Sequence, residues 1–352
     1  MLKTLLSDDL PRSRVLAVLL TAVLLALLLT PFIFPGAKAM GVAAKILVFI
    51  VLVASYDLLL GYTGIVSFAH TMFFGIGAYG VAIAFTRMGP DWGALLAGLA
   101  GAVTVSALLA LVIGLFSLRV RAIFYAMITL AVASAFLTLA SQLSDFTGGE
   151  DGLSFKVPEL LTPGFELLEE PWLGVSFDGK LITYYTICLS ALALFLLMLR
   201  IVNSPFGRVL MAIRENDFRA EALGYRVVVY RTLSNVLAAV FATLAGALLA
   251  LWLRYNGPDT SLSFEIMLDI LLMVVIGGMG TLYGAVLGAA LFVVAQSYLQ
   301  DLLKLGQGMV EGIPVLSALV SPDRWLFWLG LLFVLSVYYF PSGVVGRLRR
   351  VK

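Results

Sequence analysis

Long apolar stretches recur along the whole chain, separated by short segments that hold most of its charges. A helix rises 1.5 Å per residue, so about twenty mostly apolar residues cross the roughly 30 Å hydrocarbon core of a bilayer. Ten stretches predict membrane-spanning helices: 15–34, 42–60, 65–85, 92–118, 122–142, 181–202, 232–253, 264–276, 282–299 and 325–340. The pattern therefore predicts an all-α polytopic membrane protein.

The composition excludes a soluble enzyme. Of the 352 residues, 61% are hydrophobic and 12% are charged, and that charged share is about half that of an ordinary soluble domain. The chain also has 33 glycines, and small residues let helices approach closely in lipid. We expect residues 1–352 to form a single transmembrane domain in the lipid bilayer.

The positions of lysine and arginine predict which loops lie in the cytoplasm, because short loops rich in these residues stay on that side. The connection 203–230 and the C-terminal tail are rich in arginine and are expected inside. Segment 144–180 holds eight acidic residues and two lysines, and is expected to form an external loop. Arg119 and Arg121 fall inside under the same rule, and an even number of spans then places both termini in the cytoplasm.

Glycines interrupt the apolar pattern at 61–64 (GYTG) and at 277–280 (GGMG). Non-helical backbone at membrane depth survives only where protein covers it or where it lines a wet cavity. Paired interruptions in the two halves of a carrier indicate a translocation site. The candidates for a substrate pathway are therefore Gly61, Gly64, Gly277, Gly278 and Gly280. The alternative is that both breaks are tight turns at the membrane surface.

Two ionisable residues flank the first break and join the candidate substrate pathway, because such residues are costly inside apolar spans. Asp57 lies one helical turn before Gly61, and His70 lies six residues after Gly64. The alternative for Asp57 is that its carboxylate caps backbone groups exposed by the glycine turn. The alternative for His70 is a neutral ring that makes one hydrogen bond between helices.

Four other charged residues lie near predicted outer ends of spans. Lys38 and Lys45 are exceptions to the rule that places lysines inside. Glu265 and Asp269 lie near the start of the stretch 264–276, where water or a helix N-terminus accommodates acids without a transport role.

The inner connection contains an amphipathic segment at 208–224, where apolar and charged residues alternate at helical spacing. Its acidic residues favour docking onto a cytoplasmic protein over lying on lipid headgroups. The sequence has no G-x-x-x-x-G-K-[ST] loop for ATP, and one His and one Cys do not make an ordinary metal site. We therefore expect no catalytic site, metal or cofactor in this chain. It also has no basic domain for nucleic acid.

Six blocks, in this order, resemble branched-chain amino acid ABC importer permeases, specifically the M-type membrane subunit. They are 57–80 (DLLLGYTGIVSFAHTMFFGIGAYG), 121–131 (RAIFYAMITLA), 147–153 (TGGEDGL), 204–224 (SPFGRVLMAIRENDFRAEALG), 275–288 (VIGGMGTLYGAVLG) and 340–346 (FPSGVVG). The chain departs from the family at Asp57, where many members carry Asn, and at Ile65, where many carry Gln.

The resemblance implies that the chain is a transport subunit and not an enzyme. In such importers the permease lies in the plasma (inner) membrane and pairs with a second, similar permease. Two cytoplasmic ATPase subunits use ATP, and an external or periplasmic binding protein delivers the solute. Related permeases carry urea or short amides, which stay an alternative substrate class. A secondary transporter or channel acting alone is the other alternative.

The resemblance also implies that 208–224 is the coupling segment that seats in the ATPase cleft. The residues that it assigns to coupling are Arg208, Arg214, Glu215, Arg219, Glu221, Ala222 and Gly224. The run 221–224 (EALG) resembles the glutamate-alanine-glycine loop of ABC importers, with a shorter spacing from Glu to Gly.

Overall fold

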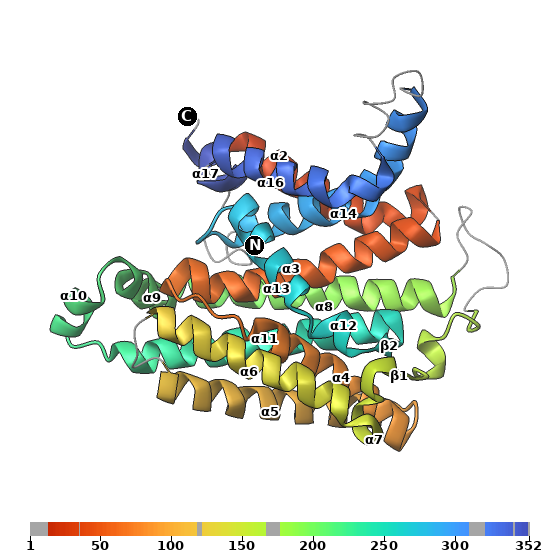
Figure 1. The fold of residues 1–352 in the computed structure, drawn as a ribbon, viewed down its shortest axis with the longest axis horizontal. Helices are drawn as coiled ribbons and strands as arrows, with labels where there is room; N and C mark the ends of the chain where they lie inside the picture. The colour runs from red at the N-terminus through yellow and green to blue at the C-terminus, as the bar shows by residue number, and fades with distance from the viewer. Residues whose placement is uncertain are drawn as a thin grey trace.

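The chain folds as a bundle of long helices that run side by side (Figure 1). The computed structural model describes residues 13–34, 36–117, 122–166, 177–309, 321–340 and 342–350. Within these ranges ten helical segments are long and apolar enough to cross a membrane. The predicted all-α polytopic fold is therefore confirmed. Arg119, Arg121 and part of the predicted external loop lie outside the described residues.

The long helices carry the spans, and short elements connect them. The long helices are α2 (Arg14–Ile33), α3 (Ala37–Thr63), α4 (His70–Met88), α5 (Trp92–Ser117), α6 (Ala122–Gln142), α8 (Gly179–Val202), α11 (Val227–Leu253), α13 (Phe264–Gly277), α14 (Leu282–Met309) and α16 (Trp325–Tyr339). The short ones are α7 (Ser144–Thr147), η1 (Gly149–Asp151), β1 (Leu153–Ser154), η2 (Glu159–Leu161), α9 (Pro205–Glu215), α10 (Asp217–Ala222), β2 (Tyr255–Asn256), α12 (Pro258–Ser261), η3 (Pro322–Arg324) and α17 (Gly343–Arg350).

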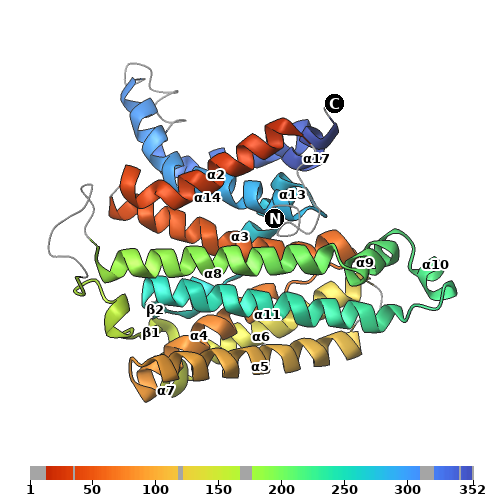
Figure 2. The same cartoon turned by 180° about the vertical axis from the view of Figure 1, so that it is seen from behind.

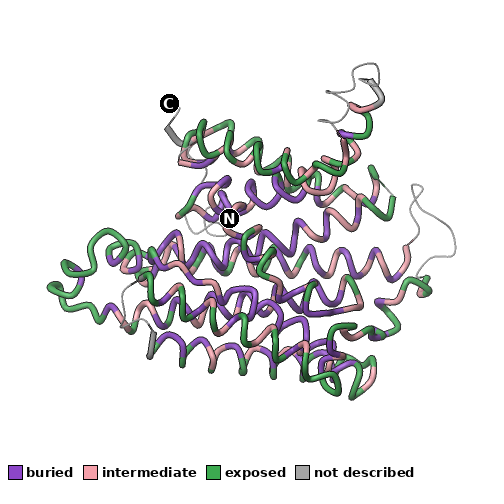
Figure 3. The backbone as a smooth tube through the Cα atoms, viewed as in Figure 1, coloured by how far each residue is buried: buried purple, intermediate pink, exposed green. Residues whose placement is uncertain are grey.

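Helix α3 lies at the centre of the bundle and is buried along most of its length (Figure 3). It packs against α8, α11, α13 and α14, and α11 in turn packs against α4 and α5. A helix enclosed by protein is apolar all round, which explains why α3 has no polar face. The outer helices instead expose apolar side chains, as at Val18, Leu25, Leu96, Leu108, Ile123, Met127, Leu326 and Val334. Such surfaces suit lipid or a second chain.

The two segments with the most distinctive charge lie at opposite ends of the bundle. β1 pairs with β2 in antiparallel fashion, with Leu153 opposite Asn256, at the end that also carries α7. α9 and α10 lie at the other end in both views (Figures 1 and 2). The predicted acidic loop and the predicted coupling loop are thus separated by the length of the helices. Which end is cytoplasmic stays a prediction.

Several predicted helices have different boundaries in the structure: α3 and α11 each begin five residues earlier than predicted, and α14 ends ten residues later. Two further differences have an identifiable cause. The span predicted over 65–85 begins at His70, because the preceding backbone bonds to side chains: the Phe68 N–H donates to Thr129 Oγ1 at 3.0 Å. The helix expected over 208–224 is divided at Asn216, whose backbone is extended. The Asn216 side chain accepts a hydrogen bond from the Arg219 N–H at 2.9 Å and so begins α10.

The closest helix contact is between α4 and α11, where glycines replace side chains. A Cβ on Gly77 would overlap the Thr243 carbonyl, and one on Gly246 would overlap the Phe74 carbonyl. These positions therefore let the two backbones touch, as small residues do in membrane bundles.

We expect Gly246→Val to destabilise the chain by about 1–3 kcal/mol, because the added side chain forces two backbones apart. Cys188 is the chain's one cysteine and is buried, so its reaction with a thiol dye on heating reports unfolding. The matched control is Gly101→Val on α5, where a Cβ meets nothing within 4 Å. Equal unfolding midpoints for the two variants would contradict the packing described.

Candidate functional site

The two glycine breaks, far apart in the sequence, meet at the end of α3 that faces α9. The Gly280 N–H donates a hydrogen bond to Oδ1 of Asp57 at 2.9 Å. A Cβ on Gly280 would lie 3.1 Å from the carbonyl oxygen of Gly61. The two interrupted segments therefore pack backbone against backbone, and we name this contact of 61–64 with 277–280 the glycine junction.

The first break is the C-terminus of α3. Gly64 has φ 71° and ψ 22°, a left-handed conformation that glycine adopts without strain, and its N–H bonds to the Leu59 carbonyl. Gly61 precedes it inside the last turn, where a Cβ would overlap the Asp57 carboxylate and the Gly280 N–H. Glycine at 61 thus permits the close approach, and glycine at 64 ends the helix.

The second break is a tight turn between α13 and α14. Gly278 and Gly280 have φ values of 115° and 80°, which favour glycine at both positions. The Gly278 N–H bonds to the Val274 carbonyl at 2.9 Å and so closes α13. A Cβ on Gly277 would overlap the Gly284 carbonyl of α14. The glycines therefore let the two helices leave the turn in contact.

Arg214 of α9 reaches both breaks. Its Nη1 donates a hydrogen bond to the carbonyl of Gly61. The same Nη1 lies 2.8 Å from the position of a Cβ on Gly280, and its Cγ lies 3.3 Å from that of a Cβ on Gly64. The structure thus brings one predicted coupling residue together with three predicted pathway glycines and, through Gly280, with Asp57.

Helix α9 is fixed to the bundle. Leu210 and Ile213 are buried on its inner side, and a Cβ on Gly207 would overlap the Val202 carbonyl at the end of α8. Its charged residues Arg208 and Glu215 are exposed. Arg214 is therefore carried by a helix whose own position is set by packing.

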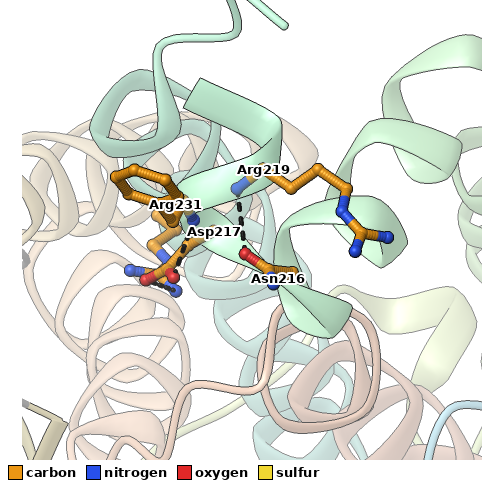
Figure 4. A network of polar contacts seen from close by, with 5 residues as sticks. Asn216, Asp217, Arg219 and Arg231 are labelled. Atoms are coloured by element: carbon orange, nitrogen blue, oxygen red, sulfur yellow. Dashed lines mark hydrogen bonds and ion pairs between the residues drawn. The ribbon is translucent and has the colours of Figure 1, made fainter. Parts of the chain in front are cut away.

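Helix α10 projects beyond α9, and an ion pair (Figure 4) and the buried Ala220, which packs with Ile213 and Val227, join it to the bundle. Asp217 lies 3.6 Å from Arg231 of α11, and the Gly224 N–H closes the next turn on the Glu221 carbonyl at 2.8 Å. Glu221, Ala222 and Gly224 are exposed, as is Arg219. Figure 4 shows Arg219, whose backbone N–H donates a hydrogen bond to the Asn216 side chain.

Two large apolar side chains project at α10 and its C-cap, among exposed charged residues. Phe218 is 80% exposed and Leu223 is 73% exposed, and Met211 of α9 is also exposed. Large apolar side chains exposed on a helix outside the spans suit contact with another molecule.

His70 lies away from the glycine junction, inside the core. Its Nε2 is 2.8 Å from Ser55 Oγ, and the Ser55 hydroxyl itself donates to the Leu52 carbonyl at 2.7 Å. The ring N–H therefore donates to Ser55, because the serine proton is already used. Ser55 lies eight residues, or about 12 Å along the helix, before Thr63, so the His70 ring is bonded well back from the end of α3.

Asp57 and His70 both have the geometry of the structural alternatives raised from the sequence. Asp57 binds a backbone N–H at a glycine turn, and His70 makes one hydrogen bond between two helices. Contact of either residue with a solute stays a prediction. No local pattern indicates that Ser55 contacts His70 or that Arg214 contacts Gly61, since contacts between distant segments depend on the fold.

We expect Asp57→Leu to cost about 1–3 kcal/mol, because it leaves the buried Gly280 N–H without an acceptor. Asp57→Asn keeps an amide oxygen for that N–H and is the matched control, with little loss of stability. The midpoint of thermal exposure of Cys188 measures both effects. If the two variants unfold at the same temperature, Asp57 does not hold the junction together.

Comparison with known proteins shows to which family the chain belongs. Residues 39–337 match the model of the family described as branched-chain amino acid transport system, permease component. No solved structure matches the chain.

Three curated relatives are permease proteins of high-affinity branched-chain amino acid transport systems. LivM of Salmonella typhimurium is 28% identical over 321 residues, which cover 86% of this chain and 74% of the relative. LivM of Escherichia coli is 27% identical over the same shares of both chains. BraD of Pseudomonas aeruginosa is 28% identical over 83% of this chain and 89% of the relative. The resemblance found in the sequence is confirmed, and the chain belongs to the family of permease components of branched-chain amino acid transport systems.

Proposed function

We propose that this chain is one transmembrane half of an ATP-driven importer for branched-chain or related amino acids. It is a multi-pass membrane protein of a permease family, and its relatives are named as transport subunits. In this proposal it lies in the plasma (inner) membrane beside a second, similar permease. Two cytoplasmic ATPase subunits use the ATP, and this chain holds no cofactor. A binding protein delivers the solute at the opposite face.

One observation carries the proposal: a projecting segment with two exposed large apolar side chains follows α9, whose Arg214 reaches the ends of three spanning helices. α10 presents Phe218 and Leu223 outward, which suits a groove on a protein partner. α9 places Arg214 on the carbonyl that ends α3 and beside the turn between α13 and α14. A force applied at α10 therefore has a short route to the glycine junction.

The proposed cycle uses that route. ATP binding closes the two ATPases and displaces α10, and Arg214 transmits the displacement to Gly61 and Gly280. Left-handed glycines at helix ends absorb changes of backbone angle that other residues resist. The spans α3, α13 and α14 then rearrange to give alternating access. Each state must be stabilised by its own contacts, and the ATPases supply that difference.

The exposed Phe218 and Leu223 also favour an ATP-driven importer over a carrier that acts alone. Such a carrier needs no large apolar side chains on a helix beyond its spans, whereas an importer driven by separate ATPases requires a docking surface there. The substrate is proposed from the relatives, whose names specify branched-chain amino acids. Urea or a short amide stays the alternative substrate class.

We expect the double variant Phe218→Ser, Leu223→Ser to retain ATPase subunits about tenfold less well than the unaltered chain. An aromatic anchor at an interface contributes about 2 kcal/mol or more, so its loss weakens binding at least to that degree. Co-purification of the ATPases with the tagged chain measures the effect.

The matched control changes the same residue types at the other end of the bundle, in Phe146→Ser, Leu160→Ser, where both side chains are also exposed. Full ATPase retention by the Phe218 and Leu223 variant, with unchanged thermal stability, would refute docking at α10. Uptake by the chain alone in liposomes would then favour the stand-alone carrier.

A further inference from the structure

A polar cavity of about 430 Å³ lies between α3, α11, α13 and α14, on the side of the bundle away from α9. Lys45 of α3 lines it, sixteen residues or about 24 Å along the helix from Gly61. Its volume is within the range of small-ligand sites. Charged side chains inside a spanning bundle are costly and indicate function.

Three polar side chains form a chain across the cavity. Lys45 Nζ donates to Oε1 of Gln296 on α14 at 2.9 Å. Nε2 of Gln296 donates to Oδ2 of Asp269 on α13 at 3.3 Å. Glu265, one turn before Asp269 on α13, also lines the cavity and is exposed. Asp259 of α12 lines the cavity as well and is also exposed. A cation and three acids therefore face one space, with a neutral amide between the cation and Asp269.

The rest of the lining is largely apolar. Phe49 and Leu249 are buried, and Trp252 is half-buried. The Lys45 ammonium lies 5.5 Å from the centroid of the Phe49 ring. The cavity thus joins a row of charges to a wall that suits an aliphatic group.

The helices α3 and α14 also carry an ordinary salt bridge, in which the two charges touch directly. Lys38 of α3 binds Asp301 of α14 directly. Lys45 and Asp269 are instead separated by the Gln296 amide. An ammonium has three donors, but among the described residues Lys45 has one hydrogen-bond acceptor. Both ions therefore retain unused capacity toward the cavity.

On the basis of the proposed function, we propose that this cavity binds the zwitterionic head of an α-amino acid. Lys45 takes the carboxylate, Asp269 takes the ammonium with Glu265 at the mouth, and the aliphatic side chain lies against Phe49 and Trp252. The Gln296 amide occupies both positions when no solute is bound: its oxygen faces the lysine and its NH₂ group faces the acid.

The same geometry selects a substrate class. A zwitterion gives Lys45 and Asp269 partners of full opposite charge in place of a neutral amide, so Coulomb attraction adds to each hydrogen bond. Urea or a short amide exchanges one neutral amide for another and gains no such contact. The cavity therefore favours amino acids over the alternative substrate class.

The first test compares ligands on the unaltered chain and needs no variant. L-leucine should raise the unfolding midpoint of the purified chain, and leucinamide, which has no carboxylate, should raise it much less. Equal stabilisation by both compounds, or none by L-leucine, would overturn the site. Since no ATPase takes part, this measurement decides the site even if the proposed function fails.

The second test measures ATP-driven uptake of radiolabelled L-leucine by the whole complex in proteoliposomes. Lys45→Gln, Asp269→Asn removes both charges together, and uptake at limiting solute should fall by about tenfold or more. Lys38→Gln, Asp301→Asn is the matched control on α3 and α14 and should transport normally. Wild-type uptake by the Lys45 and Asp269 variant would overturn the site. Failure of the unaltered complex to take up L-leucine with ATP would instead refute the proposed function.

Discussion

The contact of two glycine turns at the end of α3 constrains the whole bundle. Backbone meets backbone there because Gly61 and Gly280 have no side chains, and the Asp57 carboxylate accepts a hydrogen bond from the Gly280 N–H. The position of α13 and α14 relative to α3 depends on this contact. Arg214 binds the carbonyl of Gly61, so α9 is in direct contact with the glycine junction. Any movement of α9 changes how three spanning helices end.

Helix α3 connects the two polar regions of the protein. It carries Lys45 near one end, and Asp57 and Gly61 near the other, and it is enclosed by protein between them. A helix buried in this way moves as one body, because protein interiors are packed too closely to deform gradually. In the proposed cycle, a displacement at the glycine junction is transmitted along α3 to the charged cavity. In this view α10 receives the force, the junction converts it, and the cavity changes its shape around the solute.

Local pattern predicted most of the fold. Ten spans follow from the length of apolar stretches, and the separation of the acidic loop from the arginine-rich loop follows from charge. The start of α4 was predicted too early, because the apolar residues at 65–69 give no sign that Thr129, sixty residues away, binds their backbone. The helix breaks at Asn216 because its side chain caps a new helix, whereas the amphipathic pattern of 208–224 predicts one continuous helix.

The candidate site was predicted only in pieces. The glycines and Asp57 were identified by residue type and Arg214 by the resemblance of its segment to a coupling segment, but as two separate groups, because a sequence does not show which turns meet. In the sequence, Lys45 is an exception to the rule that places lysines in the cytoplasm. In the fold, it bonds to Gln296, which in turn bonds to Asp269. Polar residues that pair across helices 200 residues apart leave no local signal.

The most direct test is the number of L-leucine molecules imported per ATP hydrolysed by the reconstituted complex. Arg214→Ala leaves the apolar surface of α10 in place but removes the hydrogen bond to Gly61, and Arg226→Ala, at an exposed arginine nearby, is the matched control. If Arg214 couples the ATPases to the spans, its variant keeps hydrolysing ATP while the ratio falls by about tenfold or more. An unchanged ratio in Arg214→Ala would contradict transmission through the glycine junction.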